Sequence, residues 1–254
     1  MIQFVTFILL FASLPAIASE WAKNPDSGSG NAPLQCPNIP ATLSGMDVSG
    51  HQLGIDWQKL TAKPLITYSF IKATEGIDFT SPAFANDWLT SQQVGVIRGA
   101  YHFFLPKDDS ITQADFFLKT VGALAATDMP LLVDVEQSQG MAPGVIAQRL
   151  RQFLDYLEQK TGRTPVLYTY PKFWHQLGDP AGFDHFPLFI SHLNVPCPEI
   201  PSPWKDWLFW QDTNTNSFPG VPGPVDHDFF QGSLADMQKF IGAPPAPHYE
   251  EVYE

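Results

Sequence analysis

The sequence has few charged residues and few cysteines for its length. Of 254 residues, 16% are Asp, Glu, Lys or Arg, and two are cysteines, Cys36 and Cys197. The 14 basic side chains are outnumbered by 26 acidic ones, which gives a formal net charge of −12. This balance argues against nucleic acid as a partner and opposes binding to anionic membranes, because both depend on Lys and Arg meeting phosphate.

Long apolar runs are lacking after the first eighteen residues. Residues 1–18 carry no charged side chain, hold an apolar block over residues 4–11 and end in a small-residue site at 16–18. These features predict a secretory signal peptide, and hence a secreted or periplasmic protein with no stable membrane association after its removal. An uncleaved membrane anchor is the alternative, although the run is short for a span. In an oxidising compartment the even cysteine count predicts one disulfide, between Cys36 and Cys197.

Composition divides the remaining chain into three parts. Residues 19–40 are rich in Gly, Ser, Asn and Pro and predict a flexible arm or linker. Residues 41–241 predict one folded catalytic domain, since 44% of the chain is hydrophobic. Residues 242–254 hold three prolines and an acidic end, which predicts a disordered tail. We expect a monomer.

Short strands alternate with helices through the folded domain. Strands are expected over 43–49, 65–71, 94–104, 131–136 and 165–170, with the clearest helix over 143–160. Beyond residue 170 the helices shorten, and three more strands are expected over 186–191, 207–211 and 224–228. About five β/α units followed by three strands with little helix predict an α/β fold, a modified TIM-like barrel.

The short motifs of several catalytic classes are missing. The chain has no G-x-S-x-G, no P-loop, no G-x-G-x-x-G and no H-E-x-x-H. Asp226-His227-Asp228 could suggest a metal, but neighbours in a strand point to opposite faces, so only the two aspartates converge. We expect neither a metal nor a cofactor.

What the chain does contain is an apolar run, residues 131–133, that leads into Asp134-Val135-Glu136. In a strand, residues i and i+2 face the same side, so Asp134 and Glu136 should project together. Two adjacent acids raise each other's proton affinity, which suits one of them to general acid catalysis.

Other polar and aromatic residues are expected beside this pair, at the carboxyl ends of strands where barrel enzymes have their active sites. Acids lined by aromatic rings predict glycoside hydrolysis, in which one acid protonates the leaving oxygen and another carboxylate supports the cationic sugar. The expected catalytic residues are Glu136, Asp134, Asp47 and Asp226, and the expected substrate-binding residues are Tyr101, Tyr168, Trp210 and Asp228.

With these residues in place, the chain resembles the glycoside hydrolase family 25 lysozymes, the Chalaropsis-type N-acetylmuramidases. The resemblance covers about residues 43–240 and depends on seven segments in the family's order and spacing. They are Gly45-Met46-Asp47-Val48-Ser49, Phe70-Ile71-Lys72-Ala73-Thr74-Glu75-Gly76, Gly99-Ala100-Tyr101-His102-Phe103, Asp134-Val135-Glu136, Val166-Leu167-Tyr168-Thr169, Trp210-Gln211 and Val225-Asp226.

The resemblance implies cleavage of the β-1,4 bond between N-acetylmuramic acid and N-acetylglucosamine in peptidoglycan. By position, Glu136 matches the family's general acid. Asp134 matches its partner carboxylate, which either attacks the sugar carbon or orients the substrate's own acetamido group. Asp47 and Asp226 match the other active-site acids.

Three positions depart from the family pattern. Phe189 and Leu193 stand where Trp and Tyr are usual, and Asp212 stands where Tyr is usual. We expect them to alter sugar stacking on that wall.

Two other functions are consistent with parts of the pattern. One is a barrel that binds glycan without cleaving it. The other is a chitinase-like enzyme of the D-x-x-D-x-D-x-E type, whose last two acids align with Asp134 and Glu136 but whose preceding Asp would fall at Leu132.

Overall fold

The computed structural model describes residues 42–63 and 65–242. The predicted signal peptide, the arm with Cys36 and the tail from residue 243 onward lie outside the described residues. Among those described, no helix has the length and apolar character to cross a membrane.

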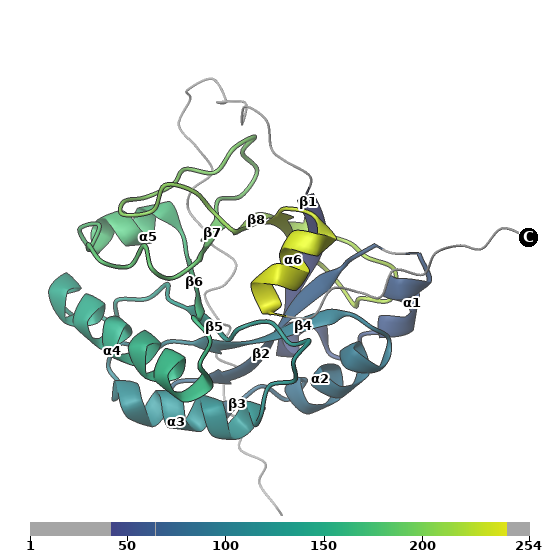
Figure 1. The fold of residues 1–254 in the computed structure, drawn as a ribbon, viewed down its shortest axis with the longest axis horizontal. Helices are drawn as coiled ribbons and strands as arrows, with labels where there is room; N and C mark the ends of the chain where they lie inside the picture. The colour runs from purple at the N-terminus through teal and green to yellow at the C-terminus, as the bar shows by residue number, and fades with distance from the viewer. Residues whose placement is uncertain (1–41, 64, 243–254) are drawn as a thin grey trace, which may run out of the picture.

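A single sheet closes into a barrel at the centre of the molecule (Figure 1). Its strand order is β1-β9-β8-β7-β6-β5-β4-β2, and a further pairing between β1 and β2 completes the ring. The short β3 (Phe79–Thr80) adds to the edge of β2. The barrel strands are β1 (Thr42–Val48), β2 (Tyr68–Glu75), β4 (Ile97–Phe103), β5 (Leu132–Asp134), β6 (Val166–Thr169), β7 (Leu188–Ser191), β8 (Phe209–Asn216) and β9 (Val225–Gln231).

Helices follow each of the first five barrel strands but neither of the next two, β7 and β8, which confirms the predicted modified TIM-like barrel. Residues 188–231, all of them described, contain no helix. After β9, a last helix lies across the barrel end opposite the mouth and buries Met237 and Ile241 against the interior. The helices are η2 (Gly50–Gln52), α1 (Trp57–Ala62), α2 (Phe84–Gln93), α3 (Ser110–Val121), α4 (Pro143–Thr161), α5 (Pro171–Gln176) and α6 (Leu234–Ile241).

The helix ends follow local chemistry. Pro143 occupies the first turn of α4, and Gly162 ends it with a left-handed φ of 67°. Ser110 is the first residue of α3 and not its N-cap. The cap is Asp109, whose carboxylate accepts a hydrogen bond from the Thr112 backbone N–H at 2.9 Å.

The last strand departs from the parallel sheet that the alternation predicts. β9 runs antiparallel to both β8 and β1. Residues 217–224 join β8 to β9 without a helix, and a direct connection of this kind links antiparallel neighbours. Asp226 therefore begins a strand rather than ending one. Because β9 is reversed, its start lies at the same barrel mouth as the carboxyl ends of the other strands.

Alternation along the strands divides the core into two layers. The barrel interior is filled mainly by aromatic rings, among them Phe70, Phe209 and Phe230. Tyr68 also lies inside, and its ring requires glycine at position 45, where a Cβ would come within 2.3 Å of the ring.

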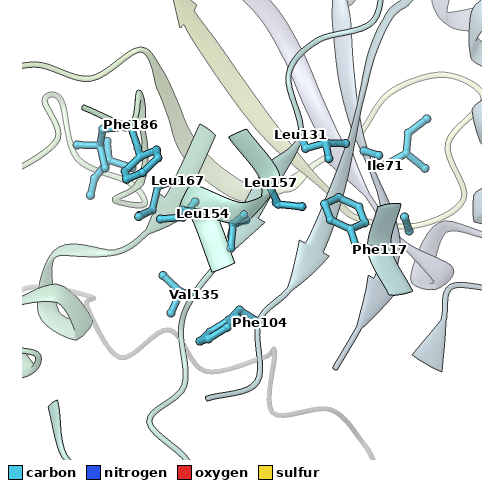
Figure 2. Packing of buried hydrophobic residues seen from close by; sticks show 14 of the residues in the cluster. Ile71, Phe104, Phe117, Leu131, Val135, Leu154, Leu157, Leu167 and Phe186 are labelled. Atoms are coloured by element: carbon cyan, nitrogen blue, oxygen red, sulfur yellow. The ribbon is translucent and has the colours of Figure 1, made fainter. Parts of the chain in front are cut away.

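A second layer packs between the strands and the outer helices (Figure 2). Val135 belongs to this layer and is fully buried. It anchors the strand so that its two neighbours, Asp134 and Glu136, face the other way. A slip of one residue would turn both acids into this outer core and Val135 out of it. Burial of such a side chain stabilises the native register by about 1.5–3 kcal/mol.

Candidate active site

Asp134 and Glu136, the two acids of the fourth β/α unit, lie on a backbone segment that is hydrogen-bonded to its neighbours on both sides. The Asp134 carbonyl accepts from the Phe104 backbone N–H at 2.8 Å. The Val135 N–H donates to the Tyr168 carbonyl at 3.0 Å, and the Val135 carbonyl accepts from Thr169 Oγ1 at 3.0 Å. The backbone therefore continues as an extended segment beyond β5, and Asp134 and Glu136 project together into the barrel mouth.

Asp134 and Glu136 form a hydrogen-bonded carboxyl pair. Asp134 is buried, with 3% of its surface exposed, whereas Glu136 is partly open. Burial raises the pKa of the Glu136 carboxyl to about 7. Burial also raises the pKa of Asp134, and the neighbouring Glu136 charge raises it further. The coupled pair therefore retains a proton near neutral pH, and a general acid requires such a proton.

Lys72 places a positive charge beside this pair. Its side chain is buried, and its ammonium lies 2.7 Å from Glu75 Oε2 and 4.9 Å from the centre of the Phe103 ring. Its charge opposes the rise in pKa of both Asp134 and Glu136. Sequence reasoning did not single out Lys72, although a lysine near the end of an apolar strand was a visible signal.

A second cluster of carboxyl side chains centres on Asp47. Gln211 Nε2 donates to Asp47 Oδ2 at 2.8 Å. Two hydroxyls, those of Tyr168 and Ser191, donate to Gln211 Oε1 at 2.9 and 2.6 Å, which fixes the orientation of the amide. Burial raises the pKa of Asp47 to about 6, against the lowering effect of the hydrogen bond from Gln211. Sequence reasoning had not assigned a role to Gln211 or Ser191.

Asp226 and Asp228 both make side-chain hydrogen bonds to Asp47. Burial raises the pKa of each, and the charge of Asp47 raises both further. The two differ in depth, since Asp226 is partly exposed at the mouth and Asp228 has no exposed surface. Asp228 therefore offers a sugar nothing to contact, which speaks against the predicted substrate-binding role.

The predicted tyrosines form the floor of the site. Tyr101 and Tyr168 are 3% and 7% exposed, and burial raises the pKa of both hydroxyls. With Phe189 and neighbouring residues they enclose a cavity of about 10 Å³ beside Asp47 and Asp134. Phe189 is fully buried inside the barrel, so this departure from the family pattern lies beneath the site rather than on a sugar-stacking wall.

Trp210 is not brought to the mouth. Its ring lies in the outer core, 4% exposed, beside Trp207 and Phe229, and its indole N–H donates to the His192 carbonyl at 2.9 Å. Alternation along β8 sends Trp210 outward and Gln211 inward. The described residues include no group of three or more His, Cys, Asp or Glu placed to hold a metal ion.

A barrel whose mouth holds paired, protonatable carboxyls is the arrangement of a glycoside hydrolase. The family model described as Glycosyl hydrolases family 25 matches residues 46–221. The protein YegX of Escherichia coli (strain K12) is 34% identical over 210 residues, which are 80% of this chain and 75% of YegX. Lysozyme M1 of Streptomyces globisporus is 32% identical over 226 residues, 84% of this chain and 76% of the lysozyme.

Solved structures agree with the sequence comparisons. The crystal structure of the bacterial lysozyme from Streptomyces coelicolor superposes with a TM-score of 0.75 at 29% identity, covering 78% of this chain and 96% of that one. The chain belongs to glycosyl hydrolases family 25, and the predicted family is confirmed. It is a glycoside hydrolase.

Proposed function

We propose that the protein is a secreted peptidoglycan hydrolase that cleaves the β-1,4 bond between N-acetylmuramic acid and N-acetylglucosamine. The substrate class follows from relatives that carry the names lysozyme and N,O-diacetylmuramidase. The observation that carries the proposal is the Glu136 carboxyl, partly open at the mouth, with a pKa raised to about 7 beside the buried Asp134.

In this proposal Glu136 is the general acid. Its proton passes to the glycosidic oxygen as the bond to the sugar carbon breaks. Asp134 is the partner carboxylate, and its negative charge stabilises the cationic sugar. The Lys72 ammonium favours the ionised form of a carboxyl in this pair, because its charge opposes the effect of burial on both members. The two members of the pair differ in exposure, since Asp134 is buried and Glu136 is partly open, and acid and base partners require such different environments.

Asp47 and Asp226 form the second part of the proposed site. Asp47 is held by Gln211, and Asp226 hydrogen-bonds to Asp47 from the start of β9. Both carboxyls face the same opening as Glu136, whose charge also raises the pKa of Asp226. We assign them to binding and orienting the sugar beside the cleaved bond.

Digestion of purified peptidoglycan, followed by mass spectrometry of the released fragments, tests the proposal. We expect muramic acid at the new reducing ends, and glucosamine ends would contradict the assigned bond. Glu136→Gln is the matched control, because it keeps the side-chain size and removes the acid. It should lower the rate by about 10²–10⁴-fold. Sedimentation of wild type with peptidoglycan, without release of fragments, would instead support a barrel that only binds glycan.

Export is also part of the proposal. It depends on the predicted signal peptide over residues 1–18, and residues in that range lie outside the described structure. Expression of the full chain in a secreting host, with amino-terminal sequencing of the exported product, tests it. A mature protein that begins at Ser19 is the expected result, and a product that keeps residues 1–18 in the membrane would support the anchor instead.

A further inference from the structure

Asp228 lies deep in the barrel between two strands that carry site residues. Its position on β9 pairs with Gly45 of β1 on one side and Gln211 of β8 on the other. Its side chain has no exposed surface. Within the described part of the chain, neither of its carboxyl oxygens receives an N–H or a hydroxyl hydrogen bond. An ionised carboxylate in such a place would lack any compensating donor.

The contact that Asp228 does make is with another carboxyl, that of Asp47. Two carboxyl groups can hydrogen-bond only when one of them carries a proton. Asp47 accepts the Gln211 amide N–H at 2.8 Å, and such a donor favours the ionised form of its acceptor. Asp228 has no comparable donor, so the shared proton belongs on Asp228.

The surrounding charges agree with this assignment. The groups that act on Asp228 are the carboxyls of Asp47 on β1, Asp226 on its own strand and Asp212 on β8, and all three disfavour a further negative charge. On β2, the Tyr68 hydroxyl faces the same region, and its pKa is raised by burial and by Asp228. Burial is the largest cause of the raised pKa of Asp228 itself.

We propose that Asp228 is a positioning residue, which stays protonated at neutral pH and donates the hydrogen bond that orients the Asp47 carboxylate toward the barrel mouth. Asp47 is then held from two sides, by the Gln211 amide and by the Asp228 carboxylic acid. The consequence for catalysis rests on the proposed hydrolysis, whereas the protonation state of Asp228 is independent of any substrate.

The direct test is infrared spectroscopy of the substrate-free protein with ¹³C-labelled aspartate side chains. At pH 7 we expect the wild type to show a protonated carboxylic acid C=O band that is weaker in Asp228→Asn. Since Glu136 carries no label, it does not contribute. Identical protonated bands in the two proteins would show that Asp228 is ionised and would overturn the proposal, whether or not the protein cleaves peptidoglycan.

Kinetics separates the donor role from simple packing. Asp228→Leu keeps a similar volume but removes the donor, so it should lower kcat by roughly 10- to 100-fold. It should also move the acid limb of the pH–rate profile to higher pH, because Asp47 then ionises less readily. Asp228→Asn restores an N–H donor and should recover most of the activity and the wild-type acid limb.

Equal losses in the Asn and Leu variants, with both folded by thermal unfolding, would overturn the donor role. If Asp228→Leu does not fold, the Asn variant and the infrared bands still decide the proposal. Absence of peptidoglycan cleavage in the wild type would contradict the proposed function, while the infrared result on Asp228 would stand by itself.

Discussion

Gln211 donates its side-chain amide to the Asp47 carboxylate, with 2.8 Å between Nε2 and Oδ2. The two residues are 164 positions apart in the chain and lie on β8 and β1, which are separated by β9 in the sheet. The amide oxygen of Gln211 is in turn held by the hydroxyls of Tyr168 and Ser191. The orientation of Asp47 is therefore set by residues from three other strands.

Removal of this amide should weaken catalysis through Asp47. In Gln211→Leu the carboxylate loses a donor, and its pKa rises above the value of about 6 that it has with the donor present. A hydrogen bond to a charged group contributes enough that kcat should fall by roughly 10- to 100-fold near pH 6. Steady-state kinetics between pH 4 and pH 9 measures both effects, and an unmoved acid limb would contradict the role given to Gln211.

The neighbouring Trp210→Phe variant is the matched control, because it changes the outward-facing residue of the same strand. It loses the indole hydrogen bond to the His192 carbonyl. We expect the free energy of unfolding to fall by about 1 kcal/mol while KM stays near the wild-type value. A large rise in KM with unchanged stability would instead place Trp210 in the substrate site.

The rate should have a narrow optimum in pH. Glu136 acts as an acid only while protonated, so kcat/KM falls as pH rises through its pKa of about 7. Asp47 accepts hydrogen bonds in its ionised form, so activity also falls as pH drops below about 6. Because the carboxyls interact, the apparent pKa values of the two limbs describe the coupled carboxyls together and not single residues. A soluble glycan fragment allows the measurement, and a plateau that extends well above pH 8 would exclude Glu136 as the acid.

Replacement of Glu136 should stabilise the protein at alkaline pH. Folding raises the pKa of Glu136 from 4.5 to about 7. Its contribution to stability is therefore fully present below about pH 4.5 and is lost as pH rises through 7. Glu136→Gln has no such loss, so at pH 8 it should be more stable than wild type by up to about 3 kcal/mol. Urea unfolding at pH 4 and pH 8 checks this, since the two proteins should differ only at pH 8.

The predicted disulfide awaits a direct test. Cys197 lies between β7 and β8, while Cys36 is outside the described residues, so the pairing stays a prediction. Thiol titration of unreduced, denatured protein should find no free thiol. Reduction should then lower the free energy of unfolding by about 2–4 kcal/mol, because the bridge would close a long loop. Two free thiols before reduction would contradict the pairing.

Much of the fold and part of the site could be predicted from the sequence. The alternation of apolar strands with helices is a local pattern, and it was sufficient for the five β/α units and the three later strands. The pair at Asp134 and Glu136 was also readable, because spacing by two residues in a strand gives one shared face. Asp47 was recognisable as an acid near the end of the first strand.

Other features depended on the tertiary structure, because they follow from which strands pair and in which direction. The reversal of β9 brings Asp226 to the mouth from the start of its strand, and the register of β8 turns Gln211 inward and Trp210 outward. Burial depth arises only when the barrel closes, and it accounts for most of the raised pKa of Glu136. The sequence by itself thus determined which chemical groups are present and the order of the elements that carry them. Barrel closure decided which groups meet and which are protonated, because contact and desolvation are properties of non-local packing.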